Sequence, residues 1–194
     1  MSQAPATDDY AKEQLQNHAS WLISVLSWIP DDKDAIRFIK NFGVTELLFE
    51  VALEAMAQES DEVSMRAQNV LLSWAFKAGR HDAHWGVLER SMCALATLAL
   101  WKDEIALIAW LKAELESRLN TQEAPVQEMR DAAARELRRH AVTSYRPEFK
   151  LSRIHQAMRQ IDQTKMQPLL QEIADLLSPD TGGEPINVYR PQPV

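Results

Sequence analysis

Apolar residues recur at intervals of three and four along most of this chain, and that spacing restricts the fold more than any other sequence feature. In the first such segment, Leu15, Ala19, Leu22, Leu26 and Ile29 follow one another at steps of four, three, four and three. Residues at these steps share one face of an α-helix, whereas a half-buried strand alternates at every second position. Similar steps return as far as residue 177. The sequence therefore predicts an all-α protein, an antiparallel helical bundle or short helical-repeat array of about eight or nine helices.

Prolines, glycines and capping side chains divide this pattern into separate helices. Pro30 ends a first helix over about 8–29, and Gly43 stops a short second one. Thr45 is predicted to cap the third helix and Gly79 to close the fourth. Pro125 is expected at the first position of a seventh helix, where its missing N–H removes no hydrogen bond.

One boundary lacks such a marker. The apolar stretch from Met92 to Trp101 runs into Lys102, Asp103 and Glu104 with no Gly or Pro between them. A single helix over 82–119 is the alternative, and we predict two helices with a tight reversal at Lys102–Asp103. The apolar stretch is shorter than the roughly 20 residues that span a bilayer, so no membrane segment is expected.

Charge and composition suggest four parts. We expect a flexible leader at 1–7, a main helical domain at 8–119, a smaller basic helical subdomain at 125–177 and a Pro/Gly-rich tail at 178–194. The net charge is −7, but residues 129–165 contain nine Lys/Arg against four Asp/Glu. A single cysteine, no disulfide and no basic, apolar leader favour the cytoplasm.

The basic segment is the first candidate site. Its predicted binding residues are Arg135, Arg138, Arg139, Arg146, Lys150, Arg153 and Arg159. If the two helices that carry them pack together through Leu137 and Ile154, their outer faces form a positive strip for phosphates or an acidic protein. A solvated face whose charges are matched within the chain is the alternative, and the acidic whole-chain charge opposes nucleic acid.

Catalytic and metal-binding patterns are sparse. His81 and His84 share a helical face and are weak candidates for a metal, against a plain helix start with Asp82 as its cap. Cys93 sits in an apolar helix and is predicted to be a small core residue rather than a nucleophile. Glu136 and His140 are expected to form an ordinary surface pair. We predict no enzyme and no cofactor.

Six tryptophans supply the second candidate site. The first predicted helix has a second apolar stripe, and other helices are also apolar on more than one side, so some of that surface is expected to stay exposed. The interface candidates are Trp21, Trp28, Trp101, Trp110 and Tyr189. We therefore expect a non-enzymatic protein-interaction module, an adaptor or subunit that binds another protein or a second copy of itself. A nucleic-acid-associated accessory protein using residues 130–159 is the alternative.

Overall fold

The computed structural model describes residues 6–81, 85–121, 124–142 and 152–179, which contain nine α-helices and no strand. The helices are α1 (Ala6–Ser27), α2 (Lys33–Asn41), α3 (Val44–Ala57), α4 (Asp61–Arg80), α5 (Trp85–Trp101), α6 (Ile105–Leu119), α7 (Gln127–Val142), α8 (Arg153–Gln160) and α9 (Gln163–Leu177). The predicted all-α fold is confirmed. The periodic apolar positions are the cause, because each helix has to bury its stripe against a neighbour.

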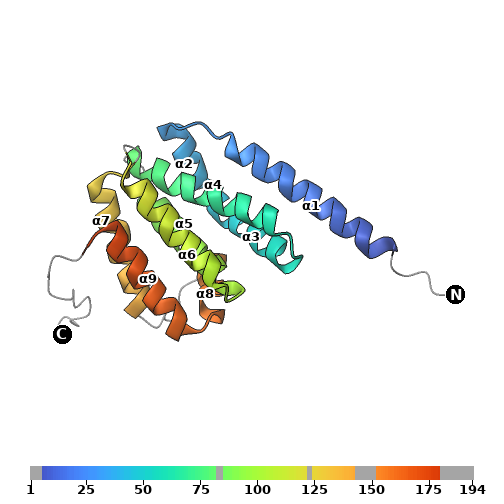
Figure 1. Cartoon of the computed structure of the whole chain (residues 1–194). Coiled ribbons are helices and arrows are strands. Elements are labelled where there is room, and N and C mark those ends of the chain that lie inside the picture. The colour runs from blue at the N-terminus through green and yellow to red at the C-terminus, as the bar shows by residue number, and fades with distance from the viewer. Residues whose placement is uncertain (1–5, 82–84, 122–123, 143–151, 180–194) are drawn as a thin grey trace, which may run out of the picture.

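Helix α5 is the centre of the molecule. Every residue from 91 to 99 is 0 % exposed, and α5 contacts α3, α4 and α6 as well as α7, α8 and α9. A helix that is apolar all round is stable only when other helices cover every side. Figure 1 shows α3 and α4 along one flank of α5, with α7 and α9 along the other. One contiguous core joins residues of 23–115 to residues of 133–177.

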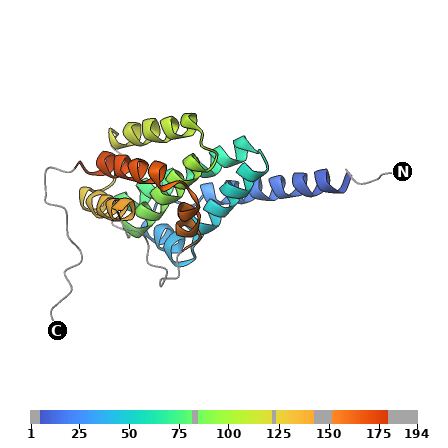
Figure 2. The same ribbon diagram turned by 90° about the horizontal axis from the view of Figure 1, so that it is seen from below.

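The remaining helices cover the outside. In Figure 2, α6 lies on one side of the body, and α2 and α8 lie on the opposite side. Within α6 only Leu111 and Leu115 are buried. No helix among the described residues is long and apolar enough to cross a membrane.

Helix α1 is attached by its second half. Ile23 and Leu26 are buried in the core, and the α4 guanidinium of Arg66 donates to the hydroxyls of Ser20 and Ser24 at 2.7 Å each. The first half extends past the ends of α3 and α4 (Figures 1 and 2).

The start of α3 corrects one prediction. Thr45 does not cap the helix: α3 begins at Val44, and Thr45 is buried inside its first turn. The residue before the helix is Gly43, whose φ of +62° lies in the left-handed region that glycine enters without steric cost. The glycine both stops α2 and turns the chain into α3.

Two more predictions, for Gly79 and for Pro125, are corrected by the contact between these residues. Gly79 lies inside α4, which runs on to Arg80, and α7 begins at Gln127, two residues after Pro125. A Cβ placed on Gly79 would lie 2.1 Å from the Pro125 Cβ. The glycine is therefore a contact point for the proline ring, and the backbone N–H of Val126 donates to the Gly79 carbonyl at 3.2 Å.

The reversal between α5 and α6 is confirmed. Helix α5 ends at Trp101 and α6 begins at Ile105. Asp103 has a φ of +56°, a left-handed conformation that Asp adopts more readily than most other residues. This single residue turns the chain back without a glycine or a proline.

Candidate functional site

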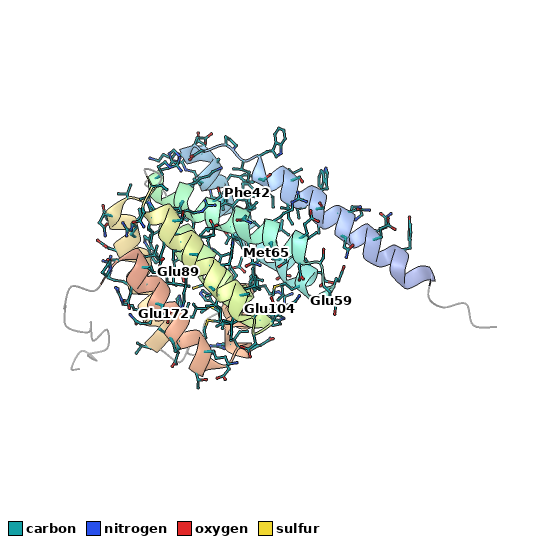
Figure 3. The ribbon with its side chains drawn as sticks, viewed as in Figure 1. Phe42, Glu59, Met65, Glu89, Glu104 and Glu172 are labelled. Carbon is teal, nitrogen blue, oxygen red and sulfur yellow. The ribbon has the colours of Figure 1, made fainter. Side chains whose placement is uncertain are left out.

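The most concentrated group of reactive side chains lies in the core, where α5, α7 and α8 meet. Glu89 and Cys93 come from α5, His140 from α7 and His155 from α8, and one ligand-type atom from each lies within 4.8 Å of the others. Figure 3 shows Glu89 on α5, on the flank where α9 packs. Glu89 and Cys93 are four residues apart, so the helical repeat places both on one face. We call these four residues the Glu89 cluster.

The carboxylate of Glu89 is the hub of the cluster. Its Oε1 lies 2.6 Å from His140 Nε2 and 3.7 Å from His155 Nε2. The two imidazole rings also pack on one another, with centroids 4.8 Å apart. Burial by itself raises the pKa of Glu89, but hydrogen bonds and charges from both histidines outweigh it and lower the pKa to about 2. Glu89 is therefore an anion in the core.

Cys93 is buried, as predicted, but its thiol also belongs to the cluster. The Sγ–H donates to Glu89 Oε1 at 3.4 Å. Burial raises the pKa of the thiol well above 9, and the negative charge of Glu89 raises it further. A thiol in this state is a poor nucleophile at neutral pH, because the thiolate is the reactive form.

Helix α3 holds α8 in position for this cluster. Glu46 Oε2 accepts a hydrogen bond from the backbone N–H of Ile154 at 3.2 Å, and Arg153 pairs with Glu50 at 3.0 Å. A carboxylate at a helix N-terminus satisfies an otherwise unpaired N–H and complements the helix dipole. These contacts fix the first turn of α8, on which His155 is the third residue.

The cluster contradicts the prediction for His140. His140 is buried, with a side chain only 3 % exposed, and its partner is Glu89, whereas Glu136 pairs with Arg139. Sequence reasoning missed Glu89 and His155 altogether. The available signal was a carboxylate one helical turn before Cys93, in a helix whose other residues are mostly apolar.

Comparisons with known proteins give no further guide. No family model, curated protein or solved structure matches this chain. Its chemistry has to be read from its own residues.

Of the two weak metal candidates, the structure describes His81 alone. His81 Nε2 lies 2.5 Å from Asp31 Oδ1, and the same carboxylate binds Arg80. A guanidinium beside the carboxylate competes with a cation for it. His84 lies outside the described residues.

Three of the predicted basic residues form ion pairs within the chain, each with a different helix. Arg138 of α7 pairs with Asp175 of α9 at 3.1 Å, and Arg139 pairs with Glu136 within α7. Arg153 belongs to the α8–α3 contact described above. Arg135 on α7 and Arg159 on α8 are exposed, as are Arg139 and Arg153, and Arg146 and Lys150 lie outside the described residues. Helix α8 packs mainly on α5 and α3, and α7 mainly on α9 and α5.

The interface candidates divide between surface and core. Trp21 and Trp28 are 66 % and 84 % exposed, and Val25 between them is 46 % exposed. These three residues are spaced four and three apart, and we call them the α1 stripe. Trp101 and Trp110 instead pack against the core, and Tyr189 lies outside the described residues.

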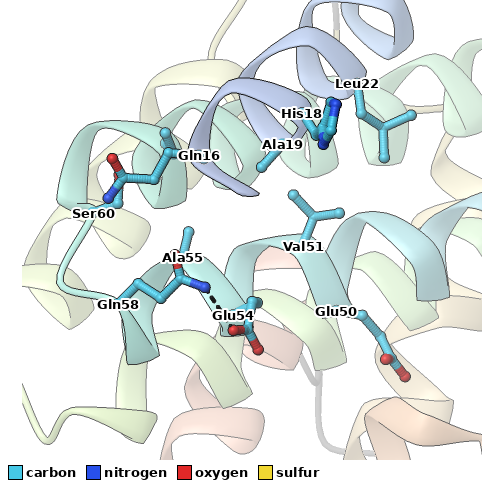
Figure 4. Close-up of a pocket in the computed structure, with 11 residues that line it drawn as sticks. Gln16, His18, Ala19, Leu22, Glu50, Val51, Glu54, Ala55, Gln58 and Ser60 are labelled. Carbon is cyan, nitrogen blue, oxygen red and sulfur yellow. Dashed lines mark hydrogen bonds between the residues drawn. The ribbon is translucent and has the colours of Figure 1, made fainter. Parts of the chain in front are cut away.

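A groove of about 360 Å³ runs between α1 and α3 (Figure 4). Its apolar lining consists of Ala19, Leu22, Val51, Ala55 and Val63. Its polar lining consists of Gln16, His18, Glu50, Glu54, Gln58 and Ser60. Among the described side chains, the lining includes two carboxylates, Glu54 and the Glu50 that pairs with Arg153, and no lysine or arginine.

Proposed function

We propose that this chain is a non-enzymatic protein-interaction module, an adaptor or subunit of a larger assembly, and that α1 binds a basic amphipathic helix of a partner protein. The observation that carries the proposal is the α1 stripe, two tryptophans and a valine at the C-terminal end of α1, on the face opposite the one that packs on the core. Tryptophan is rare on open surfaces and is enriched where partners bind.

The stripe and the groove occupy different faces of α1 that adjoin at Val25 and Leu22. Val25 follows Leu22 by three residues, which corresponds to about 60° around the helix, so the stripe begins where the groove wall ends. Trp21 and Trp28 lie about 100° and 120° around the helix from Leu22, so a partner helix in the groove has to extend over Val25 to cover the tryptophans. Such helix-in-groove binding uses anchors at helical spacing on both sides.

The charge of this surface favours a basic partner. Glu54 lines the groove together with Glu50, which pairs with Arg153, and residues 1–60 contain ten Asp/Glu against four Lys/Arg. Complementary charge speeds association and selects among apolar partners. A second copy of the chain would bring a surface of the same negative sign, so a basic helix fits better.

The test uses a synthetic helical peptide of about 18 residues, five turns long, with leucines on one face and lysines on the other. A second peptide has glutamates in place of the lysines. Binding is followed by fluorescence anisotropy of the labelled peptides. We expect the basic peptide to bind and the acidic one to bind at least about tenfold more weakly.

Matched variants locate the binding surface. Trp21→Ser with Trp28→Ser should weaken binding about thirtyfold or more, because truncating a central aromatic anchor costs roughly 2 kcal/mol. Ile105→Ser is the control, since Ile105 is 83 % exposed on α6, away from α1. The stripe variants should fold normally, because both tryptophans are solvent-facing. Equal weakening by the control, or no binding of the basic peptide, would overturn the proposal.

Two other outcomes would replace it. Concentration-dependent dimerisation that the stripe variants abolish would identify a second copy as the occupant. A complex with nucleic acid that weakens steeply with salt and is lost on charge reversal at Arg135 and Arg139 would favour the accessory-protein alternative.

A further inference from the structure

The Glu89 cluster has the composition of a metal site, and this inference is independent of the α1 surface. Among the described residues, it is the one group of three or more His, Cys, Asp and Glu side chains whose ligand atoms lie close enough to share a metal ion. Three of its four members are buried and the fourth, His155, is nearly so. The cluster thus differs from an exposed group of carboxylates, which water solvates without a metal.

We propose that Glu89, Cys93, His140 and His155 bind one divalent transition-metal ion, with Zn²⁺ as the preferred ion. Zinc takes sulfur, imidazole nitrogen and carboxylate oxygen as ligands and favours four of them in a tetrahedron. Calcium and magnesium prefer all-oxygen sites, so a thiol and two imidazoles select against both. Four protein ligands leave no open position, which is typical of a structural site.

The charges of such a site balance. Zn²⁺ bound by one thiolate, one carboxylate and two neutral imidazoles has a total charge of zero, which is what a buried site requires. Binding displaces the thiol proton of Cys93, and any proton shared between Glu89 and His140, into solvent. The metal supplies the positive charge that a thiolate beside the Glu89 carboxylate needs.

The four ligand atoms lie within 4.8 Å of one another, so a tetrahedral site requires the most distant pair to approach by about 1 Å. Bonds of about 2.0–2.3 Å in a tetrahedron place ligand atoms about 3.3–3.8 Å apart. Cys93 Sγ and His155 Nε2 already lie 3.4 and 3.7 Å from Glu89 Oε1. Only His140 Nε2, at 2.6 Å, is closer, because a hydrogen bond joins these two atoms. Replacing that hydrogen bond with metal bonds would move them apart by about 0.7 Å.

A neighbouring hydroxyl supports the required tautomer of His155. Ser152 Oγ lies 3.1 Å from His155 Nδ1. When the proton is on Nδ1, the Nδ1–H donates a hydrogen bond to the Ser152 hydroxyl oxygen, and Nε2 directs its lone pair into the cluster. Metal-bound histidines commonly have such a partner on the second ring nitrogen. The bound ion would join α8, a helix of only eight residues, to α5 and α7.

The test measures metal on the full chain. Chelator-treated protein is titrated with Zn²⁺ against a chromophoric competitor, and with Co²⁺ as a spectroscopic substitute. We expect one ion per chain, the ligand-field bands of tetrahedral Co²⁺, and a thiolate-to-cobalt charge-transfer band. Zinc should also raise the thermal midpoint, since it binds the folded state.

Variants separate ligands from bystanders. Cys93→Ser should remove the charge-transfer band, and His155→Gln should weaken Zn²⁺ binding by at least about a hundredfold. His81→Gln, which alters the other histidine candidate, should change neither. Should Cys93→Ser fail to fold, His155→Gln and the wild-type titration still decide the matter. Wild-type protein without stoichiometric binding, or with binding that His81→Gln alone abolishes, would overturn the proposal.

Discussion

Replacing Gly79 by alanine tests the joint between α4 and α7 directly. Alanine normally stabilises a helix interior by about 0.5–1 kcal/mol relative to glycine, because glycine loses more backbone entropy on folding. At this position the added Cβ would lie 2.1 Å from the Pro125 Cβ and 2.7 Å from its Cα. Carbon atoms in ordinary contact are about 3.5–4.0 Å apart, so the segment that begins α7 would have to move by more than 1 Å.

The magnitude follows from three effects. Overpacking a filled contact costs about 1–3 kcal/mol. The displacement also breaks the hydrogen bond from the Val126 N–H to the Gly79 carbonyl, at 3.2 Å, which contributes about 1 kcal/mol. After subtracting the gain in helix propensity, Gly79→Ala should destabilise the protein by about 2 kcal/mol. For a chain of this size the thermal midpoint should fall by about 4–8 °C.

The measurement is thermal or urea unfolding followed by far-ultraviolet circular dichroism. Gly86→Ala is the matched control, because Gly86 is also helical and a Cβ there meets no atom within 4 Å. That variant should be neutral or slightly stabilised. Pro125→Gly in the Gly79→Ala background should recover part of the loss, since it removes the closest side-chain atom. If Gly79→Ala were as stable as Gly86→Ala, the inferred contact between α4 and α7 would be refuted.

Two further substitutions test the buried anion and the basic segment. In metal-free protein, the pKa of Glu89 is about 2 when folded against an ordinary 4.5, which corresponds to about 3 kcal/mol. Because the folded pKa is the lower one, this stabilisation is present above pH 4.5 and is lost as the pH falls toward 2. Glu89→Gln should remove that pH dependence in urea titrations, and an unchanged acid profile would contradict the assignment. Arg138→Ala should destabilise by about 1.5–3 kcal/mol, because the guanidinium donates to Asp175 and to backbone carbonyls at the end of α9. Arg135→Ala, exposed on the same helix, should stay within about 0.5 kcal/mol of wild type, and equal losses in the two variants would argue against this structural role of Arg138.

The α1 stripe could be predicted from the sequence in part. The spacing of Trp21, Val25 and Trp28 identified a second apolar stripe beside the one that packs on the core. It did not say which tryptophans would be covered, and Trp101 and Trp110 turned out to pack inward. The difference lies in which face the neighbouring helices cover: Trp101 ends the central helix α5 and Trp110 lies on α6, which packs on α5 and α9, whereas α1 packs on α3 and α4 through the face of Ile23 and Leu26 and leaves the tryptophans outside.

Periodicity alone determined the helices, because apolar side chains spaced three or four residues apart share one face of a helix, and that face has to be buried. Local chemistry also accounts for the start of α2, where the Asp32 side chain accepts from the Ala35 N–H at 2.8 Å. Such signals act within one or two turns of chain, so they can be read without a fold.

Only the tertiary structure decided what meets in the core. From the sequence, Gly79 is predicted to end a helix, whereas in the structure it lies within α4 and contacts the Pro125 ring. His140 looks like a surface residue until α7 packs on α5 and brings it to Glu89, 51 residues earlier in the chain. The physical reason is that a side chain's burial, charge state and partners depend on which helices pack together, and no local pattern in the sequence encodes that choice.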